Sequence, residues 1–135
     1  MRKKNEPQMT FGEFSMDYME TIFPPDPELE KISQLLNDNP EVLDVVAQDM
    51  TQGLNQNGSE GMTVEQVLRC AILYQLKGYS YRELAARIAD SYNYRKFTRF
   101  YDGKIPHFAS IEKAVKRIKP ESFEKVNDLL VAYAI

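Results

Sequence analysis

Hydrophobic residues recur every three or four positions along most of this chain, the spacing that gathers them on one face of a helix. No strand-like alternation and no internal repeat is present. The pattern therefore predicts an all-α fold, a multi-helix bundle. The stripes are formed by Leu29, Ile32, Leu35 and Leu36; Val42, Leu43, Val46 and Met50; Val64, Val67, Leu68, Ala71 and Ile72; Tyr81, Leu84, Ala85 and Ile88; Ile111, Ala114, Val115 and Ile118; and Phe123, Val126, Leu130 and Tyr133.

Capping residues, prolines and glycines mark the expected helix ends. The helix that follows Thr63 is apolar on most sides, so we expect it to form the central post of the bundle. The expected boundaries are Asp26 with Pro27 for the first start; Asn39 with Pro40 for the second and Gly53 for its end; Thr63 with Gln66, a capping box, for the third and Gly78 for its end; Ser80 with Glu83, a second capping box, for the fourth; and Pro120 for the last.

The length of 135 residues suits a single domain with a sizeable core. Residues 1–25 are expected to form an N-terminal arm and linker, and residues 26–58 an acidic helical pair. Residues 59–135 are expected to form a basic helical region that packs with 26–58 into one compact domain. The turn-rich stretch QGLNQNGSEG separates the acidic and basic parts.

Charge is strongly segregated, although the formal net charge is only −3. Residues 1–61 carry −8, residues 62–120 carry +7, and residues 121–135 carry −2. A basic block of this kind is the electrostatic footprint of a surface that meets phosphate. The alternative is that the block only solvates the outer faces of helices.

Several classes of protein are disfavoured. The longest mainly apolar run, Val67 to Leu76, is interrupted by Arg69 and Gln75 and is far too short to span a membrane. The start MRKKNEPQMTF has no apolar segment of the kind found in secretory signals. Cys70 is the single cysteine, so an internal disulfide is ruled out and the cytoplasm is the expected location.

The segment Tyr79–Tyr101 has the organisation of a helix-turn-helix-like unit, and we expect a further basic helix after it. In its second helix Tyr94, Phe97 and Tyr101 share one face, which leaves Thr98 and the cations on the other. Arginine suits guanine edges and phosphates because its planar fork donates two parallel hydrogen bonds. Which cationic helix enters the major groove stays open. The candidate DNA-binding residues are Arg82, Arg87, Arg95, Lys96, Arg99, Lys113, Lys116, Arg117 and Lys119.

The stretch MTVEQVLRCAILYQLKGYSYRELAARIADSYNYRKFTRFYDGKIPHFASIEKAVKRI resembles the N-terminal domain of bacterial insertion-sequence transposases of the DDE type. Those domains pair a long apolar helix with a G-x-S-x-R-E-L helix start, an aromatic basic helix, P-x-x-x-[ST]-[LI] and a final basic helix. His107 and Phe108 depart from the Asp-His pair that family members commonly carry. The matching residues are Gly78, Ser80, Arg82, Glu83, Leu84, Phe97, Pro106, Ser110 and Ile111.

The resemblance implies a module that binds double-stranded DNA. It would dock a transposase on the terminal inverted repeats of an insertion sequence during DNA transposition and recombination, and help to pair two subunits, so a homodimer is expected. In such transposases, three carboxylates of a following RNase-H-like domain hold two divalent metals, Mg²⁺. This chain has no room for that domain, so we expect no catalysis, cofactor or small-molecule substrate in it. The ending LLVAYAI suits either a longer protein or a helix packed in its own core.

Other candidate reactive groups have structural explanations. Asp90, Asp102, Glu112 and Glu121 are expected to be caps and salt-bridge partners, not metal ligands. Cys70 lies in the most apolar helix, where burial would keep its thiol inert. His107 is expected to be a cap or a phosphate contact. The aromatic residues of the segment 92–108 could stack on bases, but their helical spacing favours the core.

Two other functions stay open. The chain could be a non-catalytic helical protein-interaction module or standalone regulator that uses the acidic segment 1–61 against a partner. In that case the −8 charge would shield the basic block. It could also be a fragment or decayed copy of a mobile element.

Overall fold

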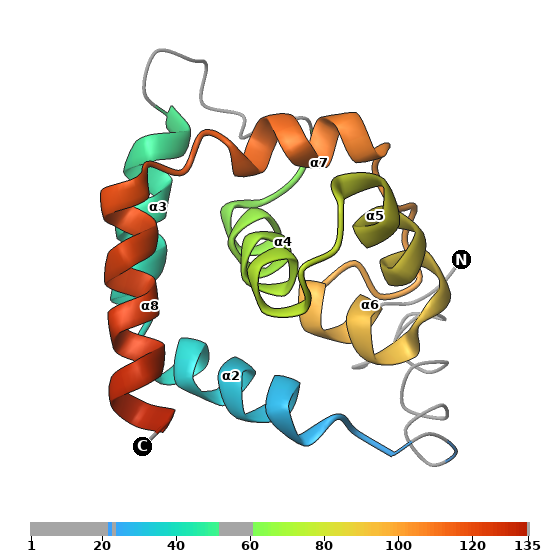
Figure 1. The fold of residues 1–135 in the computed structure, drawn as a ribbon, viewed down its shortest axis with the longest axis horizontal. Coiled ribbons are helices and arrows are strands. Elements are labelled where there is room, and N and C mark those ends of the chain that lie inside the picture. Colours follow the sequence, from blue (N-terminus) through green and yellow to red (C-terminus); the bar gives the residue numbers. More distant parts are fainter. Residues whose placement is uncertain (1–21, 23, 52–60, 135) are drawn as a thin grey trace, which may run out of the picture.

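The computed structural model describes residues 22, 24–51 and 61–134 (Figure 1). Helices connected by turns and loops make up this part of the chain, and no strand is formed within it, so the all-α prediction is confirmed. No helix in the described part combines the length and the hydropathy that a bilayer span requires. The helices are α2 (Pro27–Asp38), α3 (Glu41–Thr51), α4 (Val64–Lys77), α5 (Tyr81–Asp90), α6 (Tyr92–Thr98), α7 (Phe108–Val115) and α8 (Pro120–Ala134).

Helix α4 lies at the centre of the bundle, as its apolar girth predicts. Figure 1 shows α3 and α8 on one side of it, α5 and α6 on the other, α7 above and α2 below. The seven consecutive residues Val67–Leu73 are all buried, so every side of this part of α4 faces protein. A single hydrophobic cluster joins buried residues of the acidic helices, such as Leu36 and Val46, to Leu84 and Ile111 of the basic helices.

The predicted caps explain where most helices begin and end. The Asp26 carboxylate accepts from the backbone N–H groups of Glu28 and Leu29 at the start of α2. Thr63 and Gln66 make both hydrogen bonds of the predicted capping box at the start of α4. At the end of α4, Gly78 takes the left-handed conformation with φ of 72°, which glycine adopts without steric cost. These predictions are confirmed.

Three details expected at the helix ends differ in the structure. The Asn39 side chain donates to the Leu35 carbonyl and so closes α2; it does not cap α3. The Glu83 carboxylate pairs with Arg87 at 3.4 Å, and only the Ser80 half of the second capping box forms. Helix α7 ends at Val115 and tight turns carry the chain on to the buried Ile118, so the predicted stripe there outlasts its helix. The arm 1–21 and the end at Gly53 lie outside the described residues.

A buried carboxylate fixes the start of the last helix. Asp49 of α3 is only 8% exposed, and its Oδ2 accepts from the backbone N–H of Lys119, 2.9 Å away, immediately before Pro120 opens α8. An acceptor at a helix N-terminus satisfies a donor that has no partner within the helix. A side chain from α3 thereby ties α8 to the acidic pair, a contact that no local sequence signal predicts.

Replacing Ile111 by Ala should lower the free energy of unfolding by about 2–5 kcal/mol, because the side chain is fully buried between α7 and its neighbours and the change leaves a cavity. Urea unfolding followed by circular dichroism measures this. The matched control is Val131→Ala in α8, where the side chain is 60% exposed and a change within about 0.5 kcal/mol is expected. Equal losses in the two variants would contradict the burial described for α7.

Candidate nucleic-acid interface

A three-residue turn, Gly78 to Ser80, joins the central helix α4 to helix α5. The left-handed Gly78 reverses the chain, and its N–H donates to the Tyr74 carbonyl at 3.0 Å. The Ser80 hydroxyl then accepts from the Glu83 N–H at 3.1 Å and starts α5. Both ends of the turn are therefore fixed by local hydrogen bonds, which set α5 at a defined angle to α4.

Helix α5 divides sharply into an inner and an outer face. Leu84 and Ile88 are fully buried, whereas Arg82, Ala86 and Arg87 are exposed, as the sequence pattern predicts. The period of 3.6 residues explains the division, because positions 84 and 88 lie one turn apart on the same side. The outer face of α5 thus offers two arginines around a small residue.

Each arginine of α5 rests on an aromatic ring. The Arg82 guanidinium carbon lies 4.2 Å from the ring centroid of Phe108, the first residue of α7. The Arg87 guanidinium lies 5.2 Å from the Tyr79 ring and also pairs with Glu83. A cation over a ring face is attracted by the ring quadrupole and keeps its edge donors free to turn outward.

The cations of the segment from α7 to α8 stand mostly at the surface. Lys113, Lys116 and Lys119 are exposed, and Arg117 is half-buried. Lys116 Nζ pairs with Glu112 Oε2 at 2.7 Å, and this hydrogen bond raises the pKa of Lys116. Because α5 and α7 pack directly on each other, the two helices form one continuous unit.

The predicted cations of α6 bind other groups of the protein itself. Arg95 donates to the backbone carbonyls of Ala89 (3.0 Å), Tyr101 (2.7 Å) and Gly103 (3.0 Å), so it clamps the loop that follows its own helix. Lys96 Nζ lies 3.4 Å from a carboxylate oxygen of Glu30 in the acidic helix α2. Both side chains are only partly exposed.

The remaining cation of this group, Arg99, lies just beyond α6. Its Nε donates to Glu65 at 3.2 Å, its Nη1 to the Tyr101 hydroxyl at 3.2 Å and its Nη2 to Asn37 at 3.3 Å. Burial acts to lower the pKa of Arg99, but its bonds to Glu65 and Tyr101 outweigh this and raise it. The guanidinium therefore serves the packing of α2 and α4.

Thr98 is not on an outer face, so that part of the sequence prediction is wrong. The side chain is fully buried, and its hydroxyl donates to the Tyr94 carbonyl at 2.7 Å. The reason is that Thr98 is the last residue of α6 and lies four positions after Tyr94, so helical spacing places the two side chains on the same side of the helix.

The aromatic residues of the segment 92–108 belong mainly to the interior. Phe97 and Phe100 are buried, and Tyr94 packs against the core. Tyr92, Tyr101 and Phe108 are half-buried. This burial supports the expected structural role of the set over base stacking.

A buried arginine that the sequence pattern treats only as an interruption connects three helices. Arg69 of α4 is 0% exposed. Its Nε donates to Glu65 at 3.0 Å, its Nη1 to the Ser33 hydroxyl at 2.9 Å and to the Phe97 carbonyl at 3.0 Å, and its Nη2 to Asn37 at 3.3 Å. The guanidinium also lies 5.1 Å from the Phe97 ring centroid. We call these five residues the Arg69 hub.

Opposing effects act on the pKa of Arg69 in the Arg69 hub. Burial lowers the pKa of Arg69, the neighbouring charge of Arg99 lowers it further, and Glu65 opposes both. A single carboxylate thus serves two guanidinium groups. Arginine keeps its charge under these conditions because its ordinary pKa is above about 12, so the site holds a permanent buried cation. A signal for it was present in the sequence, since Glu65 and Arg69 have the i, i+4 spacing of a helical ion pair.

A family model described as Transposase domain (DUF772) matches residues 17–117. The chain belongs to this family. The match confirms the transposase resemblance predicted from the motifs, and it covers the Arg69 hub, the turn between α4 and α5, and all of α7. Comparison with curated proteins gave no match, and comparison with solved structures gave none either.

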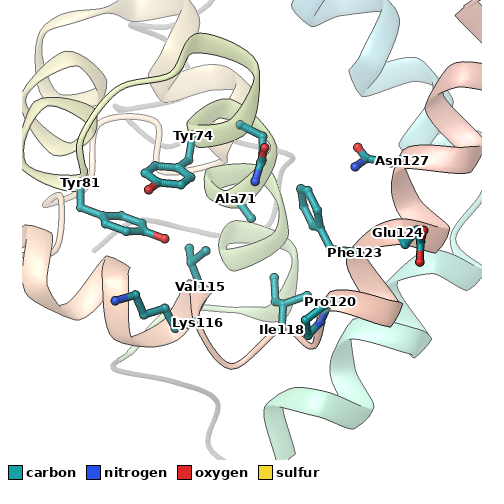
Figure 2. A pocket seen from close by; sticks show the side chains of 11 residues that line it. Ala71, Tyr74, Tyr81, Val115, Lys116, Ile118, Pro120, Phe123, Glu124 and Asn127 are labelled. Carbon is teal, nitrogen blue, oxygen red and sulfur yellow. The ribbon is translucent and has the colours of Figure 1, made fainter.

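A groove of about 610 Å³ opens between α4, α7 and α8 of this transposase domain (Figure 2). The rings of Tyr74 and Tyr81 stack in it with centroids 4.1 Å apart, and Phe123 lies on the α8 side. Burial and the adjoining Tyr74 raise the pKa of Tyr81 to about 12. Lys116 lies along one edge, so the groove combines aromatic walls with one cation.

Two of the groups considered for chemistry, His107 and Glu112, have structural partners in the transposase domain. His107 Nδ1 accepts from the Ala109 N–H at 3.1 Å, which confirms it as the cap of α7. Glu112 is the ion-pair partner of Lys116, as expected. Within the described ranges, no group of three or more His, Cys, Asp or Glu side chains could hold a metal ion. Cys70 is buried in α4.

Replacing Arg69 by Met should lower the free energy of unfolding by about 3 kcal/mol or more. The change leaves the Phe97 carbonyl and the Ser33 hydroxyl without their buried donor, which costs more than the added apolar contact returns. Urea unfolding measures the effect. Arg82→Met, the same change at an exposed position of α5, is the control and should stay within about 1 kcal/mol, because it removes only the contact with the Phe108 ring. A stable Arg69→Met variant would show that the hub is dispensable.

Stability should fall as the pH rises above 9. Burial raises the pKa of Cys70 from 9.0 to about 12, so the thiol of the unfolded chain ionises first and pulls the equilibrium towards unfolding between these values. By about pH 10.5 this amounts to about 2 kcal/mol, at 1.36 kcal/mol per pH unit. Cys70→Ala should flatten the decline, as measured by urea unfolding across this range. If the wild-type chain and Cys70→Ala lost stability equally as the pH rises, the raised pKa of Cys70 would not be the cause of the decline.

Proposed function

We propose that this transposase domain binds double-stranded DNA and docks a transposase on the terminal inverted repeats of its insertion sequence. The observation that carries the proposal is the packed pair α5 and α7, whose cations Arg82, Lys113 and Lys116 are exposed while the apolar stripes of both helices are buried. A phosphate can approach these outward-facing groups without loss of core packing, and at Lys116 it would replace Glu112 as the partner of the ammonium group.

The proposal separates the nine predicted cations by whether their contacts tie distant parts of the fold together. Arg87 and Lys116 pair with carboxylates four residues away, Glu83 and Glu112, so they stay in the DNA-binding set. Arg95, Lys96 and Arg99 stabilise the fold through α2, α4 and the loop after α6. The other six are assigned to DNA: Arg82, Arg87, Lys113, Lys116, Arg117 and Lys119. They belong to α5, α7 and the turn before α8, so the proposal places the duplex along this side of the bundle.

The chemistry of transposition is assigned to a separate RNase-H-like domain, which the family resemblance implies. That domain would supply the carboxylates for Mg²⁺, so the present chain acts by binding and assembly. Pairing of two such domains on the two ends of an element is part of the same proposal. The single cysteine of the chain suits a reducing compartment, and we propose the cytoplasm as the location.

One observation favours a second function, a helical protein-interaction module or regulator. Acidic side chains of α2 pair with cations of the basic half: Glu28 with Lys77 at 3.9 Å and Glu30 with Lys96 at 3.4 Å. The acidic segment thus shields part of the basic block within one chain. Under this alternative, reversing the charges of Arg82 and Lys113 would leave DNA affinity unchanged.

Affinity for a labelled 20-base-pair duplex should depend steeply on salt. If the six assigned cations each neutralise one phosphate, log affinity should fall against log salt with a slope of about −5. Fluorescence anisotropy over a series of NaCl concentrations measures the slope. Lys113→Ala should make it shallower by about 1, whereas Lys125→Ala, the same loss of charge on the exposed side of α8, should leave it unchanged. An affinity that hardly responds to salt would contradict DNA binding by this surface.

A further inference from the structure

Two helix junctions of the basic half could form a helix-turn-helix, and their geometries differ. Helices α5 and α6 are joined through Ser91 alone, which is at once the C-cap of the first and the N-cap of the second. Helices α4 and α5 are joined by the three residues Gly78 to Ser80, with a left-handed glycine first. A turn of three or four residues, often containing glycine, is what the motif requires.

The two candidate reading helices also differ in what they expose. Helix α6 has seven residues, and its cations are held by backbone carbonyls and by α2. Helix α5 buries Leu84 and Ile88 completely and leaves Arg82 and Ala86, one turn apart, at the surface. A helix that enters the major groove must keep its outer side free, and its N-terminal residues contact the base edges.

Arg82 stands apart from the other arginines of the described helices. Its guanidinium is stacked 4.2 Å from the Phe108 ring, and no carboxylate pairs with it in the described part of the chain. Arg87, by contrast, pairs with Glu83, and Arg95 is clamped on carbonyls. Stacking holds the plane of the guanidinium while its edge donors stay available, which is the arrangement that bidentate binding to guanine O6 and N7 needs.

We infer that α4 and α5 form the helix-turn-helix of this domain, that α5 enters the major groove, and that Arg82, positioned by Phe108, recognises a guanine. The inference rests on the proposed DNA binding and adds the reading helix and the base. Ala86, one turn further along the exposed side, is small enough to let the helix approach the base edges closely. The other assigned cations then contact phosphates and set the position of α5 in the groove.

Selection from a pool of 20-base-pair duplexes with randomised centres tests this. The wild-type chain should enrich a sequence with an invariant guanine. Arg82→Lys keeps the charge but removes the planar fork, so the preference for that guanine should fall about tenfold or more. Phe108→Leu should weaken the same preference without removing the arginine. Lys113→Ala should lower affinity for the selected and the shuffled duplex equally.

The outcomes separate this inference from the proposed function. Loss of the guanine preference in Arg82→Lys, with circular dichroism unchanged and the shuffled duplex still bound, supports it. A preference that survives in Arg82→Lys, or salt-dependent binding without any selected sequence, overturns the assignment of Arg82 and leaves DNA binding intact. Failure of the wild-type chain to bind any duplex overturns both.

Discussion

The buried guanidinium of Arg69 is the interaction on which the arrangement of the helices depends. Removing a charge from water is costly unless hydrogen bonds replace the lost hydration, and these come from α2, α4 and α6 together. The guanidinium of Arg69 has all of these hydrogen-bond partners only when the three helices take their observed positions. Apolar stripes would tolerate some sliding of one helix on another, whereas Arg69 requires particular partners. It therefore fixes the positions of α2, α4 and α6 relative to one another.

This requirement decides which basic helix faces outward. Phe97, in the last turn of α6, belongs to the Arg69 hub, and α2 lies against α6 with Glu30 paired to Lys96. Helix α6 therefore serves to hold the other helices together, although its basic composition is typical of a helix that contacts DNA bases. The acidic front half and the basic block partly neutralise each other at this contact. The contacts of Arg82, Arg87 and Lys116 lie elsewhere, with Phe108, Glu83 and Glu112.

The match to the transposase domain family includes most of the helices but not the last one, α8. The matched residues 17–117 end in the turn after α7, and α8 lies beyond them. Yet α8 contributes the fully buried Val126, and Asp49 of α3 binds the backbone at its start. In this chain α8 therefore completes the core next to α3. It also forms one wall of the groove in which Tyr74 and Tyr81 stack.

The local sequence by itself determined the class of fold, the starts of α2, α4 and α5, the end of α4 at Gly78, and the inner and outer faces of α5. These features depend on side chains within one turn of each other, so their physics is contained in short stretches. Motif order also determined the family. Only the tertiary structure decided the partners of the buried Arg69 and the engagement of Arg95, Lys96 and Arg99. Those contacts join residues up to 66 positions apart, as Lys96 and Glu30 are, and a cation takes its role from whichever partners the fold brings to it.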